Sequence, residues 1–163
     1  ERKWNARVYD GFPIRFWDQW LDDRQPTVFV QEARAGAQPR DLLAGTRLAA
    51  EPGFGGQMLD SGESLPAVWT PDGQGILIVA TTGRNRSAHA PVETDLFLVP
   101  VAGGEPLRLT QDPESYGAPE FSPDGRMLVV GVTPGGTGKV YHLTRLAAYP
   151  WPFEAKARRV LTA

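Results

Sequence analysis

Apolar residues occur along this chain in short runs instead of at the spacing of a helix face. The runs GILIVA at 75–80 and MLVVGV at 127–132 are rich in β-branched residues and are bounded by turn residues. Such runs are typical of strands that are buried on both faces. A shorter run at 95–99 and alternating residues at 107–110 follow the first of them. The pattern therefore predicts a fold made of short antiparallel strands.

The two long apolar runs each follow nearly the same turn sequence. TPDG at 70–73 aligns with SPDG at 122–125, and 122 − 70 is 52. A Leu-Thr pair recurs at 109–110 and 161–162, and 161 − 109 is again 52. In such a turn Pro presets φ, Asp bonds back to the backbone and Gly adopts a positive φ. We therefore expect Trp69 and Phe121 each to end a strand whose antiparallel neighbour is the apolar run. Several short strands per repeat at this period are typical of propeller blades.

The repeats predict an all-β fold, a partial β-propeller of about three four-stranded antiparallel blades. We expect one incomplete propeller domain, with a divergent N-terminal blade at 1–50, a linker loop at 51–63, and blades at 64–110 and 111–163. The N-terminal blade lacks the Pro-Asp-Gly turn. Its residues 28–30 and 41–42 nevertheless match the third and fourth strands of the later repeats.

Individual segments carry finer expectations. The fourth strands at 107–109 and 159–161 suit outer edges, so they should be more exposed than the apolar runs. In the last blade, alternating residues at 139–145 predict the third strand, and 147–154 predict a Pro-rich, aromatic insertion. Helix should be scarce, with one turn near 16–23.

Composition and charge exclude several classes of function. A formal net charge of −2 supplies no basic field for phosphates, so no nucleic-acid partner is expected. The clusters Arg84/Arg86 and Arg158/Arg159 are expected to be solvated loop and edge-strand charges. No apolar run approaches the roughly 18 residues that cross a bilayer, so we expect a soluble protein without a membrane partner. Zero Cys excludes disulfides and leaves the compartment open between cytoplasm and periplasm. The chain begins at Glu1, so it is expected to be an excerpt or a processed product.

Catalytic and ligand motifs are each incomplete in this sequence. GVTPGGTGK at 131–139 has Thr133 where a phosphate-binding loop needs Gly, and it is expected to be a hairpin between the second and third strands of its blade. GESLP at 62–66 ends in Pro, unlike a nucleophile elbow. We therefore predict no catalytic residue, no metal and no cofactor, and we assign no substrate-binding residue. The remaining candidates lack the spacing of a triad, a zinc site or a calcium loop: His89, His142, Asp22, Asp23, Asp112 and Glu114.

The repeated aromatic-[Ser/Thr]-Pro-Asp-Gly turn before an apolar strand resembles the blades of TolB-type propellers. It also resembles the propeller domain of the prolyl oligopeptidase family of serine peptidases. The segment IRFWDQW at 14–20 is similar to a lead-in of dipeptidyl-aminopeptidase and acylaminoacyl-peptidase members, with Phe16 where that pattern usually has His. Arg15, Trp17 and Trp20 of this lead-in would either face a substrate tunnel or lie in the core.

The resemblance implies a non-catalytic segment of a peptidase. The propeller of that family covers an α/β-hydrolase domain and limits access to short or unfolded peptides. The implied partners are a peptide substrate, reached through the parent enzyme, and its own catalytic domain. No adjacent Glu pair occurs here, so the dipeptidyl-peptidase site for a free amino terminus is not carried over. The alternative is a TolB-like scaffold that binds proteins and catalyses nothing.

The number of repeats predicts self-association. A propeller usually closes with about four to eight blades, and about three at this period account for the chain. A repeat array that is cut short exposes an apolar end face. We therefore expect the isolated fragment to form a dimer or larger assembly.

Overall fold

The chain folds into short antiparallel strands with very little helix. The computed structural model describes residues 15–16, 19–20, 24–59, 62–87, 90–135 and 142–162. Three two-stranded hairpins lie in the N-terminal part: β1 (Arg15–Phe16) with β2 (Gln19–Trp20), β3 (Phe29–Val30) with β4 (Arg40–Asp41), and β5 (Gln57–Leu59) with β6 (Gly62–Ser64). Helical elements in the described residues are α1 (Arg47–Ala50), η1 (Arg84–Arg86) and η2 (Ala155–Ala157).

Two four-stranded antiparallel sheets follow, and each keeps its strands in chain order. Sheet I consists of β7 (Ala67–Trp69), β8 (Gly75–Ala80), β9 (Asp95–Pro100) and β10 (Leu107–Arg108). Sheet II consists of β11 (Glu114–Phe121), β12 (Met127–Pro134), β13 (Arg145–Pro150) and β14 (Arg159–Val160). The all-β class is therefore confirmed, and consecutive sheets of this kind are compatible with part of a propeller.

The two Pro-Asp-Gly turns join the first and second strands of the sheets, as predicted. Trp69 ends β7 and Phe121 ends β11. Gly73 and Gly125 each have φ 69°, a conformation that residues with a Cβ adopt only under strain. The hydroxyl-Asp pairs are equivalent as well, because the Thr70 hydroxyl donates to Asp72 and the Ser122 hydroxyl donates to Asp124, both at 2.6 Å.

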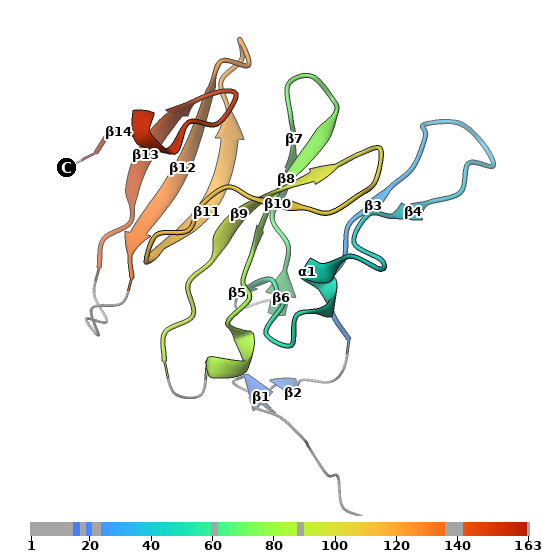
Figure 1. The fold of residues 1–163 in the computed structure, drawn as a ribbon, viewed down its shortest axis with the longest axis horizontal. Helices are drawn as coiled ribbons and strands as arrows, with labels where there is room; N and C mark the ends of the chain where they lie inside the picture. Colours follow the sequence, from blue (N-terminus) through green and yellow to red (C-terminus); the bar gives the residue numbers. More distant parts are fainter. Residues whose placement is uncertain are drawn as a thin grey trace, which may run out of the picture.

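Sheet I is the middle layer of the described structure (Figure 1). One face, which includes Ile76 and Ile78, packs on Leu43 and Phe54 of the N-terminal part. The other face, which includes Leu77, packs on sheet II. β8 is buried along its whole length, whereas β10 and β14 are exposed. The expected order of burial, with the apolar runs deeper than the edge strands, is therefore confirmed.

The strands of the last unit differ from those predicted, most of all in the position of the third strand. The third strand is β13, so the strand expected at 139–145 is wrong at 142–144, which lie outside any strand, and meets β13 only at Arg145. The expected insertion at 147–154 is also wrong at its start, since Ala147 and Ala148 are buried in β13 and pair with β12. The fourth strand, expected at 159–161, is confirmed as β14. Residues 131–134 of the expected hairpin belong to β12, and 136–139 lie outside the described residues.

Two smaller expectations also fail. The helical turn predicted near 16–23 is wrong where the structure describes that range, because Phe16 and Gln19 pair between β1 and β2. The linker predicted as a loop at 51–63 contains β5 and most of β6, which are paired in antiparallel register. Short alternation over so few residues gives a weak strand signal. The division of the chain into blades at these boundaries stays a prediction.

The twin turns predict how stability depends on pH. Hydrogen bonds from Thr70 and from the Gln74 backbone lower the pKa of Asp72 below its ordinary value, and Ser122 and the Arg126 backbone do the same for Asp124. A folded-state pKa below the unfolded value gives stability that is present above about pH 4 and is lost as pH falls through the folded pKa.

We therefore expect the urea midpoint of the double variant D72N/D124N to fall below that of the unmodified chain at pH 6. At pH 3 the two midpoints should lie closer together. Urea titrations at both pH values measure this difference. The control is Glu120→Gln, which removes a carboxylate from an exposed side chain outside both turns. If D72N/D124N lowered the urea midpoint equally at both pH values, the carboxylates of Asp72 and Asp124 would not account for the dependence of stability on pH.

Candidate functional site

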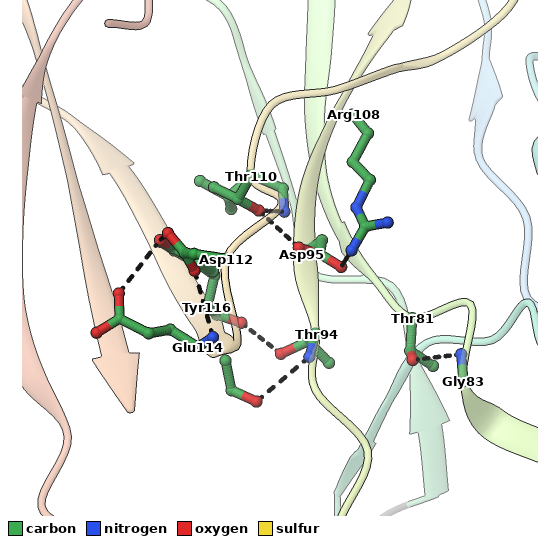
Figure 2. Close-up of polar contacts among 11 residues, drawn as sticks. Thr81, Gly83, Thr94, Asp95, Arg108, Thr110, Asp112, Glu114 and Tyr116 are labelled. Atoms are coloured by element: carbon green, nitrogen blue, oxygen red, sulfur yellow. Dashed lines mark hydrogen bonds and ion pairs between the residues drawn. The ribbon is translucent and has the colours of Figure 1, made fainter. Parts of the chain in front are cut away.

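A polar seam joins sheet I to sheet II and is the most elaborate cluster of polar side chains in the described residues. Thr94, directly before β9, accepts a backbone hydrogen bond from Tyr116 of β11 at 2.9 Å and donates its hydroxyl to the Tyr116 carbonyl at 2.7 Å. The Thr94 backbone N–H donates to the Ser115 hydroxyl at 3.3 Å. Figure 2 shows Thr94 facing Tyr116 across the seam. The two sheets are thus joined by backbone hydrogen bonds as well as by apolar packing.

The Asp95 carboxylate joins β9 to β10, the outer strand of sheet I. It accepts from the Thr110 hydroxyl at 2.9 Å and from Arg108 at 2.6 Å (Figure 2). Burial raises the pKa of this carboxyl above its usual value, while the contacts with Thr110 and Arg108 oppose that shift. The Thr110 hydroxyl also accepts from the Leu96 backbone at 3.1 Å. The threonine of the Leu-Thr pair, which is the last element of the repeat in the sequence, therefore binds the third strand through its side chain.

A second group of polar side chains continues the seam within sheet II. The buried Tyr116 hydroxyl donates to Asp112 at 2.6 Å. Burial and the bond to Asp112 raise the pKa of Tyr116, and burial raises the pKa of Tyr149 beside it. Arg158 donates to Glu114. Burial by itself lowers the pKa of Arg158, but the bond to Glu114 and the electrostatic interactions with Tyr149, Glu114 and Tyr116 together outweigh burial, so the pKa lies above the ordinary value. Tyr116, Tyr149 and Arg158 therefore keep one protonation state near neutral pH, which suits a structural role.

Two of the arginines expected to be solvated are instead paired and largely enclosed. Arg84 lies 3.5 Å from Glu63, and both side chains are mostly buried. The Glu63 carboxylate also accepts from the Gly56 backbone at 2.8 Å. Arg158 pairs with Glu114 within sheet II. The solvated reading is therefore wrong for Arg84 and Arg158, because a carboxylate 21 or 44 positions away in the sequence enters the same site. Arg86 and Arg159 are exposed, as expected.

The weak catalytic candidates do not come together. Ser64 ends β6 and is followed by β7, so its turn joins strand to strand and not strand to helix. His142, expected in a strand, lies in irregular chain before β13. Among the described residues, no group of three His, Cys, Asp or Glu side chains could hold a metal ion, and no helix has the length and apolar character of a membrane span. The other candidates lie outside the described residues or have no described side chain: Asp22, Asp23, His89, Trp17, Arg15 and Trp20.

The sequence reading missed most of the seam. Thr94, Asp95 and Tyr116 were not singled out, although Thr110 was recognised as part of the repeat. Asp95 stands at the start of an apolar strand and Tyr116 lies between polar residues, so neither position looks special locally. The recurrence of Thr110 at Thr162 is the one sequence signal that points to these contacts. Both hydroxyls accept a hydrogen bond from the third strand of their sheet, and Thr162 accepts from the Leu146 backbone at 2.9 Å.

The fold and the seam together define an all-β protein of packed four-stranded antiparallel repeats, in which the polar side chains of the seam bind one another. No family model matches the chain. The chain is 27% identical over 141 residues to the uncharacterized peptidase YuxL of Bacillus subtilis (strain 168), and the match covers 68% of this chain. It covers 20% of that protein, so the chain spans about a fifth of the length of this relative. This distant likeness indicates a peptidase-related protein.

Proposed function

We propose that this chain is a non-catalytic β-propeller segment of a serine peptidase, which limits access to an α/β-hydrolase domain outside the chain. The observation that carries the proposal is the repeat of whole four-stranded sheets, with equivalent Pro-Asp-Gly turns, in a chain that resembles a peptidase over two thirds of its length. The substrate class is short or unfolded peptides, which reach the hydrolase domain past the propeller.

The polar side chains of the described sheets support a structural role over a catalytic one. Hydrolysis requires an activated nucleophile and an oxyanion site. In the described residues, the buried hydroxyls of Thr94 and Thr110 are held by hydrogen bonds to a backbone carbonyl and to a carboxylate within the sheets. The Asp95 carboxylate accepts hydrogen bonds from Arg108 and Thr110. The Thr94 contact fixes one sheet on the next, and the Asp95 contacts fix the outer strands of sheet I to each other. Both suit a rigid cover over a separate reaction centre.

The isolated chain is expected not to hydrolyse dipeptidyl or N-acyl-aminoacyl chromogenic substrates. It is also expected not to react covalently with a serine-directed fluorophosphonate, since Ser64 ends β6 and leads into β7, whereas a nucleophile elbow joins a strand to a helix. Intact-mass spectrometry after labelling measures this directly, with a serine peptidase of known activity as the positive control. Stoichiometric labelling of a serine in this chain would overturn the proposal.

The continuation of the reading frame separates this proposal from a TolB-like protein scaffold. A peptidase requires a Gly-x-Ser-x-Gly elbow, then Asp, then His, in the polypeptide that carries these repeats. A polypeptide with repeats of this type and no such residues would favour the scaffold and contradict the gating role.

A further inference from the structure

The hairpin β5–β6 interrupts the edge of sheet I that β7 forms. The backbone N–H of Val79 donates to Pro66, directly before β7. Two residues further on, the backbone N–H of Thr81 donates to Gly55 at 2.8 Å. Alternate residues of a strand form hydrogen bonds on the same side, so Gly55 and Pro66 both lie on the β7 side of β8. The chain between them turns back on itself as β5 and β6, and the hairpin is therefore an insertion in this edge.

Close contacts fix the base of the hairpin. The Gly56 backbone N–H donates to the Glu63 carboxylate at 2.8 Å, and the same carboxylate lies 3.5 Å from Arg84. A Cβ added to Gly55 would clash with the Glu63 carboxylate, and one added to Gly56 would clash with the Ser64 carbonyl. The two strands therefore approach each other where no side chain fits, and the first residue of β5 has a defined position.

That first residue, Gln57, lies against sheet II. A Cβ added to Gly117 of β11 would lie 3.6 Å from the Gln57 Nε2 atom. The Gln57 side chain is partly buried, and within the described part of the chain its carboxamide has no hydrogen-bond partner. A carboxamide offers N–H donors and a carbonyl acceptor, the same groups that a peptide backbone presents. Because enclosed polar groups normally bind a partner, Gln57 is placed to receive one at this edge.

Strand β11 is irregular at the same point. Its register with β12 shifts between Gly117 and Glu120, so Ala118 and Pro119 have no register partner in β12. Ala118 has φ 45°, a left-handed conformation that a residue with a Cβ adopts only under strain. It is exposed, and β11 is an edge strand of sheet II. Bulges and strained residues are frequent beside binding sites. The bulge thus presents backbone outside the regular ladder, next to the Gln57 carboxamide.

We propose that Gln57 and the β11 bulge at Gly117 and Ala118 bind the backbone of an extended peptide. The peptide exchanges hydrogen bonds with the Gln57 carboxamide and lies along the edge of β11, a mode of recognition in which main-chain contacts supply the affinity. Gly117 suits this role because a missing side chain lets a second backbone approach the strand closely. Contacts with the backbone alone accept peptides of varied sequence.

The choice of a peptide as the occupant rests on the proposed function, whereas the position of the site rests on the geometry of the hairpin and the bulge. The test uses the full chain labelled with ¹⁵N and a capped hexapeptide of alternating alanine and threonine. This peptide carries no charge, and threonine favours an extended backbone. Titration to millimolar peptide, followed by backbone amide chemical shifts, measures both the affinity and the place of binding.

We expect the amide signals of Gln57, Gly117 and Ala118 to shift saturably. Gln57→Ala should weaken binding by about two- to tenfold, the effect of one lost hydrogen bond. Gly117→Val should weaken it at least as much, because its side chain would lie against the Gln57 amide. The matched control Gln74→Ala, at an exposed glutamine in the first Pro-Asp-Gly turn, should leave the affinity unchanged. Circular dichroism of each variant checks that it is folded.

The absence of saturable shifts at the bulge would rule out the site. Peptide binding that Gln57→Ala and Gly117→Val both leave unchanged would rule it out as well. Either result leaves the gating role to its own tests, which are the fluorophosphonate labelling and the continuation of the reading frame. Binding at the bulge in a polypeptide without a hydrolase domain would support the site and contradict the gating role, so the two proposals fail separately.

Discussion

Leu96→Ala is expected to lower the free energy of unfolding by roughly 2–5 kcal/mol, the range for removing a leucine side chain from a well-packed core. Leu96 is fully buried between the sheets, where it packs with Leu77 and Val79 on residues of sheet II such as Tyr116. The residues around Leu96 are held in paired strands, so they cannot move far enough to fill the cavity that the substitution leaves.

The matched control is Leu146→Ala, the same substitution at the equivalent position of the next sheet. It should cost less than about 1 kcal/mol, because a side chain that is 45% exposed gives up much less burial. Urea unfolding of both variants, at a protein concentration where the chain is monomeric, measures the difference. Equal losses for the two leucines would contradict the packing of sheet II on Leu96.

Local signals in the sequence were sufficient to predict the all-β fold and the turns. Pro-Asp-Gly has a fixed conformational meaning at 71–73 and 123–125, and the apolar run after each turn is long enough to indicate a buried strand. Both conditions depend on a few adjacent residues. The structure therefore confirms β8 and β12, the strand ends at Trp69 and Phe121, and the exposed fourth strands.

Alternating residues predict the third strand of sheet II at 139–145, whereas the strand begins at Arg145 and ends at Pro150. The counterpart of Asp95 is Arg145, at an offset of 50, while the second strands keep an offset of 52. The connection before β13 is shorter and the connection after it is longer, and the two changes cancel by the fourth strand. Ala147 and Ala148 carry little strand propensity, so their burial is decided by pairing with β12.

The polar seam was beyond the reach of sequence pattern because its members meet only in three dimensions. Thr94 and Tyr116 are 22 positions apart, and Glu114 and Arg158 are 44 apart. Each residue alone has an ordinary surface or strand explanation. The docking of sheet II on sheet I brings Thr94 to Tyr116, and the folding of sheet II brings Arg158 to Glu114, so these contacts could be predicted only after the strand pairing and packing were known.

Gly125→Ala is expected to destabilise the chain more than Gly73→Ala, although the two glycines occupy the same place in the same turn. Both have φ 69°, so a Cβ at either position costs roughly 1–2 kcal/mol of backbone strain. At Gly125 the added carbon would also lie 2.7 Å from the Pro71 Cβ and 3.1 Å from its Cγ. Overpacking against a rigid proline adds about 1–3 kcal/mol.

The expected losses in the free energy of unfolding are therefore about 2–5 kcal/mol for Gly125→Ala and about 1–2 kcal/mol for Gly73→Ala. Urea unfolding followed by tryptophan fluorescence measures both, and Gly73→Ala serves as the control for strain without contact. A loss at Gly73 equal to that at Gly125 would mean that the Pro71 contact contributes nothing. In that case the stacking of successive turns would not help to set the register between the two sheets.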